Sequence, residues 1–290
     1  MIPAQNINDP EEAKWDKIIR PKRNLFDFRL GELWKARDLV MLFVWRDFVA
    51  LYKQTILGPL WYLIQPLLTT LVFTVIFGNI AKLPTDGLPT FIFYLSGTTV
   101  WGYFAACLEA TSNTFTKNSA IFGKVYFPRL AVPVSIVISN LISFAIRLGV
   151  FLIFWGYFIL AGSKIHPNIG ILLLPVLVLL MAGMGLGFGI IVSALTTKYR
   201  DLQNLVGFGV QMLMYTTPVI YPLSTVTGIW RYLILANPMT PVVELFRQAF
   251  LGTSSIDPAW LYYTAGFTVL VLFVGLLMFN RVEASFMDTV

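Results

Sequence analysis

Residues 169–195 read IGILLLPVLVLLMAGMGLGFGIIVSAL, and this stretch decides the class of fold. It contains no charged residue. A helix needs about 20 mostly apolar residues to cross the hydrocarbon core of a bilayer, and this stretch is longer than that. We therefore expect residues 169–195 to form a transmembrane helix.

Stretches of similar length and character lie on both sides of it, and we expect each of them to span the membrane. They cover about 57–80, 90–114, 131–161, 203–221 and 260–280. The composition agrees, because 57% of the residues are hydrophobic and 12% are charged, whereas soluble domains carry about 25% charged residues. The sequence predicts an all-α integral membrane protein with six transmembrane helices, of which 203–221 is the least apolar.

The segments outside the spans are more polar. Residues 1–29 are mixed in charge, and we expect a cytosolic tail there. In residues 30–56 apolar side chains recur at helical spacing between charged ones, which is typical of an amphipathic helix in the membrane interface. Residues 284–290 are predicted to be a cytosolic C-terminus.

A long segment, 222–259, separates the last two predicted spans. It contains two apolar pieces, 229–236 and 242–251, with Asn237-Pro238 between them. Each piece is too short to cross a bilayer. We expect an external re-entrant helical hairpin, which enters the membrane and returns to the same side. The alternative is an ordinary extramembrane loop.

The basic residues predict the orientation, because Lys and Arg gather in cytoplasmic loops. Sixteen of the 21 lie in the N-terminal region, in the loops after the second and fourth spans, and in the tail. Four lie on the opposite side, and Arg147 lies inside a span. We therefore expect a multi-pass protein of the cell membrane with both termini in the cytoplasm.

No catalytic or metal-binding constellation is evident in the sequence. The single histidine, His166, has no second histidine or cysteine beside it, and Cys107 cannot form an internal disulfide. Gly123-Lys124 does not complete a phosphate loop, because Asn118 stands where the motif needs glycine. We expect no enzyme and no cofactor in this chain. If the protein transports a substrate actively, the energy must come from a partner or an ion gradient.

Small residues recur inside the fourth predicted span. Gly183 and Gly187 are four residues apart, as are Gly185 and Gly189. This spacing places small residues on one side of a helix and favours close helix packing in lipid.

Five groups of motifs follow one another along the chain. They are RDF (46–48) and YKQTILGPLW (52–61) with QP (65–66), VYFPR (125–129) with VP (132–133), KYRDL (198–202), PVIYP (218–222), and NPMTP (237–241) with Glu244 and Arg247. In this order they resemble the membrane subunit of ABC-2 type polysaccharide exporters, which export O-antigen, capsule and teichoic acid. The resemblance covers roughly residues 30–283.

The resemblance implies that residues 57–283 are an ABC-2 type transmembrane domain. It also implies a homodimer bound to two copies of a separate ATPase subunit, which holds ATP and Mg²⁺. The substrate is then a lipid-linked polysaccharide, exported from the cytoplasm across the bacterial inner membrane. The alternatives are an exporter of a drug or lipid, a secondary transporter, or a scaffold for membrane enzymes.

In this family the loop between the second and third spans is the coupling helix, which sits in a groove of the ATPase. The corresponding loop here, about 112–129, has apolar anchors and charged flanks, as helix-in-groove recognition requires. The expected coupling residues are Phe115, Ile121, Phe122, Lys124, Val125, Phe127 and Arg129. The alternative is a loop that only lies in the interface.

Aromatic side chains are dense in the first two spans, and their flat rings suit the apolar faces of sugars. The residues expected along a substrate pathway are Trp61, Tyr62, Phe73, Tyr94, Trp101, Tyr103, Phe104 and Arg147. For the rings, the alternative is helix packing or contact with lipid. For Arg147, the alternatives are a structural pair, for example with Glu109, or a contact with the lipid-carrier phosphate or the sugar.

The hairpin is expected to have a gating or a structural role. Glu244 and Arg247 are three residues apart on a predicted helix, so their side chains can pair. The residues expected to act in gating are Tyr221, Asn237, Pro238, Glu244 and Arg247.

Overall fold

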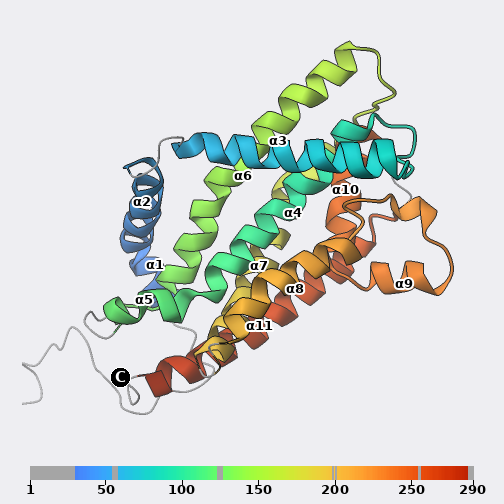
Figure 1. Ribbon diagram of the computed structural model, residues 1–290. Helices are drawn as coiled ribbons and strands as arrows, with labels where there is room; N and C mark the ends of the chain where they lie inside the picture. The colour runs from blue at the N-terminus through green and yellow to red at the C-terminus, as the bar shows by residue number, and fades with distance from the viewer. Residues whose placement is uncertain are drawn as a thin grey trace, which may run out of the picture.

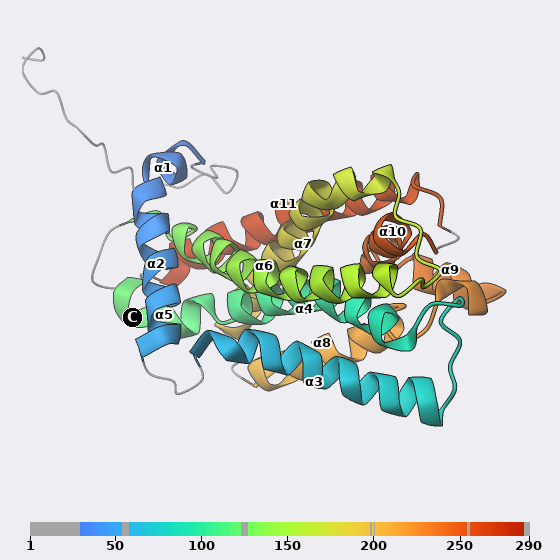
Figure 2. The same cartoon turned by 90° about the horizontal axis from the view of Figure 1, so that it is seen from above.

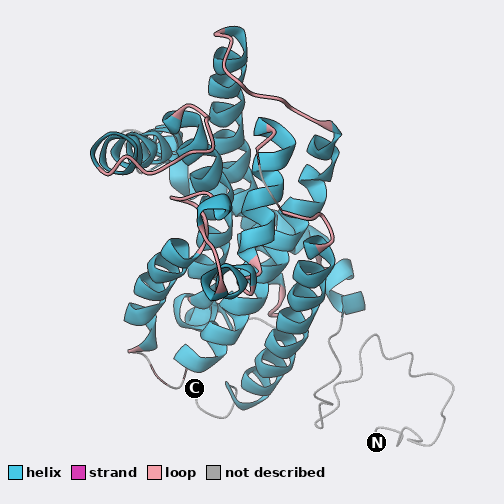
Figure 3. Cartoon of the chain, turned by 90° about the vertical axis from the view of Figure 1, so that its right-hand side faces the viewer, coloured by secondary structure: helices cyan, strands magenta, loops and turns pink. Residues whose placement is uncertain are grey.

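The computed structural model describes residues 30–53, 58–122, 127–197, 199, 201–253 and 256–286. These residues form helices joined by loops, and no strand occurs among them (Figures 1 and 3). The predicted all-α class is therefore confirmed. The predicted tail, 1–29, and the last four residues, 287–290, lie outside the described residues.

Five helices of the described chain are long and apolar enough to cross a membrane. They are Trp61–Ile80 (α3, Trp61–Phe73, continued by a π-helix, Thr74–Ile80), α4 (Thr90–Ser112), α6 (Ala131–Leu160), Ile169–Thr196 (a 3-10 helix, Ile169–Leu173, then α7, Leu174–Thr196) and α11 (Trp260–Phe286). They match the spans predicted over 57–80, 90–114, 131–161, 169–195 and 260–280.

The sixth predicted span, 203–221, is wrong as a continuous membrane helix. Helix α8 (Leu202–Thr216) has only 15 residues, which is about 22 Å at 1.5 Å per residue, short of a hydrocarbon core of about 30 Å. Thr217 is extended, with ψ at 143°, because a residue before proline avoids the helical region. Pro218 was therefore the sequence signal that we did not use.

The backbone that follows α8 is irregular but enclosed by protein. Thr217, Val219 and Leu223 are all 0% exposed. Non-helical backbone at membrane depth is tolerated where protein buries it and satisfies its polar groups. The segment 217–223 can therefore lie inside the bundle, provided that its carbonyl groups find donors.

Helix α4 lies at the centre and packs against α3, α6, α7, α8 and α10. The predicted glycine pairs of α7 face two different neighbours. A Cβ atom at Gly185 would lie 2.6 Å from the Cβ atom of Cys107 on α4. One at Gly187 would lie 2.9 Å from Val271 on α11. The close packing predicted from the glycine spacing is confirmed, and it brings α7 against both helices.

The predicted hairpin consists of α9 (Ile229–Leu235) and α10 (Met239–Leu251). Figures 1 and 2 show both helices at one end of the molecule, while α5 (Thr114–Phe122) and the last turns of α11 lie at the other. Helix α10 has 13 residues and is almost entirely buried, whereas Trp230 on α9 is 68% exposed. The two helices are confirmed, and their entry into the membrane and their placement outside the cell stay predictions.

Burial of α10 requires partners for the last four carbonyl groups of the helix, which no helical N–H reaches. All four have donors between 2.7 and 3.2 Å away: Asn168 Nδ2 for Gln248, Asn168 N–H for Ala249, Trp155 Nε1 for Phe250 and His166 N–H for Leu251. Gly252 ends the helix with φ at 77°, the left-handed conformation that glycine adopts readily. His166 thus serves the fold through its backbone.

The helix predicted over 30–56 is present in two pieces, and 54–57 lie outside the described residues. The pieces are α1 (Leu30–Lys35) and α2 (Arg37–Lys53). Helix α2 packs on α6 and crosses the bundle at the end that carries α5 (Figure 2). Phe43 is buried, whereas Met41 and Trp45 are 58% and 63% exposed. An exposed apolar face beside charged residues agrees with a position in the interface.

Candidate functional site

Glu244 and Arg247 form an ion pair inside the bundle. Arg247 Nη1 lies 3.3 Å from Glu244 Oε1, and the two residues are 1% and 3% exposed, respectively. The predicted pairing is confirmed. Because a buried charge is costly without full hydrogen bonding, the remaining donors of Arg247 also need partners.

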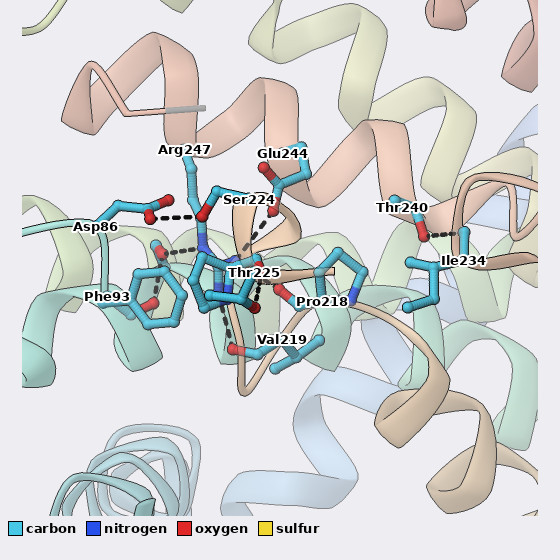
Figure 4. A network of polar contacts seen from close by, with 12 residues as sticks. Asp86, Phe93, Pro218, Val219, Ser224, Thr225, Ile234, Thr240, Glu244 and Arg247 are labelled. Atoms are coloured by element: carbon cyan, nitrogen blue, oxygen red, sulfur yellow. Dashed lines mark hydrogen bonds and ion pairs between the residues drawn. The ribbon is translucent and has the colours of Figure 1, made fainter. Parts of the chain in front are cut away.

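Those partners come from the irregular segment after α8 and from α4. Arg247 Nη2 donates to Val219 O at 2.8 Å, and Nη1 donates to Pro218 O. Nε donates to Ser96 Oγ at 3.3 Å. Figure 4 shows Arg247 beside Pro218, Val219 and Phe93, and the centroid of the Phe93 ring lies 3.8 Å from Cζ of Arg247. Arg247 therefore supplies donors to two carbonyl groups of the non-helical segment that follows α8.

Further contacts tie this segment to the hairpin and to the loop before α4. Asn237 Nδ2 donates to Thr217 Oγ1 at 2.8 Å. Ser224 Oγ donates to Asp86 Oδ1 at 2.6 Å (Figure 4). Pro238 O accepts a hydrogen bond from Thr264 of α11 at 3.2 Å.

We call these groups, together with Arg247 and Glu244, the Arg247 network. Of the predicted gating set, Asn237, Pro238, Glu244 and Arg247 belong to it, and Tyr221 is half-buried beside the core. The network links α4, α8, α10 and α11, so a movement of the hairpin would disturb contacts with all four helices. Sequence reasoning missed Ser96 and Phe93, whose sequence carries no sign of an arginine partner.

A second polar region lies between α3, α4, α6 and α8. It is a cavity of about 350 Å³. Its polar and aromatic lining comprises Gln65, Thr69, Thr98, Trp101, Glu109 and Arg147. We call it the Arg147 cavity. Its polar groups come from three different helices, although each helix is apolar enough to face lipid elsewhere.

Arg147 lies near the middle of α6 and has no hydrogen bond or ion pair with any residue that the structure describes. Its Nε atom is buried and without a partner. Glu109 lines the same cavity but lies two helical turns beyond Gly102, about 10 Å along α4. The alternative in which Arg147 pairs with Glu109 does not hold in this structure.

The guanidinium of Arg147 lies against the backbone of α4 at Gly102. A Cβ atom there would collide with Arg147 Nη1. Glycine at this position therefore leaves the space into which Arg147 extends. Sequence reasoning selected Arg147 and Trp101 but missed Gly102 and Gln65.

The other predicted pathway aromatics are distributed differently. Tyr94, Tyr103 and Phe104 are at most 2% exposed, and they pack in the core of the subunit. Trp101, which borders the cavity, has its ring 5.2 Å from that of Phe104. For these buried rings the helix-packing alternative holds.

The remaining three aromatics of the set, Trp61, Tyr62 and Phe73, lie on α3. Phe73 stacks edge-on against Tyr94 at 6.2 Å. Trp61 is 51% exposed, and Tyr62 is half-buried. Trp61 is therefore open to a ligand, to lipid or to another subunit.

The predicted coupling loop contains α5, but two of its expected anchors point inward. Phe115 and Phe122 are 1% and 2% exposed, and the ring of Phe115 lies 4.8 Å from that of Phe279 on α11. Both rings pack inside the subunit, so neither is exposed to a partner in this structure. Sequence alone could not tell which apolar face of a nine-residue helix meets the core. The exposed side carries Lys117 and Ile121.

The residues after α5 also face the subunit. Arg129 Nη1 donates to Glu283 O at 3.1 Å, and its guanidinium lies over the ring of Phe122. The ring of Phe127 lies 5.8 Å from that of Phe122. Lys124 and Val125 lie outside the described residues. Arg129 thus links α5 to α11, and Phe127 packs against α5.

Known proteins are similar to this sequence over most of its length. An O-antigen export system permease protein of Myxococcus xanthus is 28% identical over 261 residues, covering 89% of this chain and 98% of that protein. One of Klebsiella pneumoniae is 26% identical over 264 residues, covering 90% and 97%. A polysialic acid transport protein of Escherichia coli is 25% identical over 237 residues, covering 80% and 89%.

A family profile described as ABC-2 type transporter matches residues 38–251. The match begins in α2 and ends at the last residue of α10, so it contains α5, the Arg147 cavity and most of the Arg247 network. The chain therefore belongs to the ABC-2 type transporter family.

Proposed function

We propose that this chain is the permease subunit of an ATP-driven exporter that moves a lipid-linked cell-surface polysaccharide from the cytoplasm across the bacterial inner membrane. The observation that carries the proposal is similarity along nearly the whole length to permeases named for O-antigen and polysialic acid, two different glycans. ATP hydrolysis belongs to a separate subunit. A drug or lipid as cargo has no comparable support.

The proposed topology has six crossings and both termini in the cytoplasm. Five crossings are the long helices, and α8 with the buried segment 217–223 makes the remaining one. In support, Gln203 at the start of α8 donates to Thr116 Oγ1 of α5 at 2.7 Å. At the other end Thr217 meets Asn237 of the hairpin. The chain therefore passes from the α5 end to the hairpin end between these residues.

We propose that the exposed side of α5, with Lys117 and Ile121, enters a groove of the ATPase. The two side chains are four residues apart and share one side of the helix. Two copies of the permease would bind two ATPase subunits. Exposed apolar residues on α3 and α8, such as Leu71 and Phe208, agree with contact to the second copy.

Transport in vesicles tests the function. The permease and its ATPase subunit are reconstituted in liposomes that contain a lipid-linked oligosaccharide, and the glycan reaching the distal leaflet is measured after addition of ATP. We expect ATP-dependent movement of the glycan lipid by the complex and none by either subunit alone. Movement of phospholipid or drug without movement of the glycan lipid would contradict the proposal, as would ATP turnover by this chain alone.

A further inference from the structure

We infer that the Arg147 cavity is a phosphate-binding site, used by the phosphate that links lipid and glycan while the substrate crosses the membrane. The inference rests on the proposed function and adds a residue, a location and a ligand class to it. It starts from the geometry of the cavity.

The first argument is the state of Arg147 itself. Charged residues inside a membrane protein are costly, and where they occur they usually line a substrate path or pair with another group. Arg147 pairs with no residue that the structure describes, and its Nε atom is buried without a partner. The guanidinium therefore has free donors at mid-membrane.

The second argument is the space around it. The cavity of about 350 Å³ places Gln65, Thr69 and Thr98 along its walls with Arg147. The amide of Gln65 and the hydroxyl of Thr69 can donate to phosphate oxygens, and the planar fork of arginine matches two of them. The hydroxyl of Thr98 already donates to Tyr94 O at 2.9 Å. Glu109 also lines the cavity. It lies about 10 Å along α4 from Gly102, so its carboxylate does not pair with Arg147.

The third argument is the demand of the cargo. A phosphate anion cannot enter the hydrocarbon core without large loss of hydration energy. A cation near the middle of a span lowers that cost, because its charge-assisted hydrogen bonds to the phosphate replace part of the lost hydration. Arg247, on α10, cannot do this, because each of its guanidinium nitrogen atoms already has a protein partner. Arg147 is the cation in the described part of the bundle that remains available.

Binding to the permease–ATPase complex in nanodiscs tests the inference. The probe is a radiolabelled polyprenyl phosphate that carries one sugar, compared with the matching glycoside that lacks phosphate. We expect Arg147→Gln to weaken binding of the phosphate probe at least tenfold, as loss of a charge-assisted pair does. Binding of the uncharged glycoside should not change. Lys164→Gln removes an exposed cation elsewhere and should leave both affinities as they are.

A second variant leaves the charge in place. Gly102→Ala puts a methyl group where Arg147 Nη1 lies, so the guanidinium must move. We expect a loss of phosphate binding similar to that of Arg147→Gln. A structural role for Arg147 would instead lower the thermal midpoint of Arg147→Gln, which we expect to be unchanged or raised.

The source of the phosphate is separated by competition. Nanodiscs made with phosphatidylglycerol instead of a zwitterionic lipid should not displace the probe from the wild type. Displacement that depends on Arg147 would keep the phosphate site but assign it to a bilayer lipid. Wild-type affinity in both Arg147→Gln and Gly102→Ala would overturn the inference. Because binding needs no transport, failure of the vesicle assay would contradict the proposed function separately.

Discussion

Two arginines lie inside the helix bundle, and their surroundings are opposite. Each guanidinium nitrogen of Arg247 has a partner, whether a backbone carbonyl, a hydroxyl or a carboxylate. Arg147 has no hydrogen bond or ion pair with the described residues, and it borders a cavity of about 350 Å³. Both cations stand in surroundings that disfavour charge, so the difference in partners calls for an explanation.

The difference separates a structural arginine from one that is available to a ligand. A fully satisfied network holds a single arrangement, and here it secures backbone that could not otherwise lie inside a membrane protein. An arginine that borders a cavity and has no hydrogen bond with the described residues suits a ligand that arrives with its own charge. Substitutions at Arg247 and at Arg147 should therefore change the stability of the protein by different amounts and in different directions.

The largest effect is expected for Arg247→Leu. It leaves the carbonyl groups of Pro218 and Val219 and the carboxylate of Glu244 buried without their donor, and removal of one partner of a buried pair costs about 3–5 kcal/mol. We expect a strongly lowered thermal midpoint of the purified protein. Arg147→Leu is the matched control and should not lower it. Equal losses in the two variants would abolish the distinction between the regions.

A similar contrast between a buried and an exposed side chain applies to α5. Phe122→Ala empties a buried site, which costs about 3 kcal/mol, and should reduce the yield of folded protein. Ile121→Ala changes an exposed side chain, so stability should change by less than about 0.5 kcal/mol.

Co-purification with the ATPase measures whether the exposed residue of this pair, Ile121, contributes to binding of the partner. We expect Ile121→Ala to weaken recovery of the ATPase although the permease remains folded. Full recovery and unchanged export in Ile121→Ala, and also in Lys117→Ala, would show that the exposed side of α5 does not contact the partner.

Two glycines of α4 test the same comparison between Arg247 and Arg147, with smaller expected effects on stability. A Cβ atom at Gly97 would lie 2.8 Å from Arg247 Nη2 and 3.0 Å from Val219 O, both of which are held in place. Gly97→Ala should therefore cost about 1–3 kcal/mol, as overpacking does. At Gly102 the obstacle is only the free end of Arg147, so Gly102→Ala should leave the thermal midpoint nearly unchanged. A lower midpoint for Gly102→Ala than for Gly97→Ala would contradict this reading.

The smallest effect on stability is expected for single-cysteine variants. They test on which side of the membrane the hairpin end and the α5 end of the molecule lie. In a background without Cys107, Lys164→Cys lies at the hairpin end and Lys117→Cys at the α5 end. Both positions are exposed, so neither should affect folding. A membrane-impermeant thiol reagent should label position 164, and not 117, from outside intact cells. The opposite pattern would place the Arg247 network on the cytoplasmic side.

Several features followed from the sequence because they depend on local composition. Length and lack of charge predicted five long membrane helices within a few residues. The four-residue glycine spacing predicted close packing, although which helix each pair would face was not readable. The i,i+3 spacing of Glu244 and Arg247 predicted their pairing, since the geometry of one helix settles it.

Other predictions failed where two apolar surfaces had to be told apart. Phe115 and Phe122 looked like anchors for a partner, yet they pack on Phe279 and Phe127. Tyr94 and Phe104 looked like a pathway lining, yet they are buried in the core. The hydrophobicity of a side chain predicts that it will be removed from water, but it does not predict which surface will cover it.

The sequence by itself determined the all-α membrane class, the hairpin and, through its motifs, the family. Only the tertiary structure decided which polar groups are satisfied. Arg147 and Arg247 are alike in sequence as cations within apolar surroundings. They differ because Arg247 meets the carbonyl groups of a helix broken at Pro218, whereas Arg147 extends over Gly102 into a cavity. Such partners come from segments far apart in the chain, and short-range sequence patterns carry no record of them.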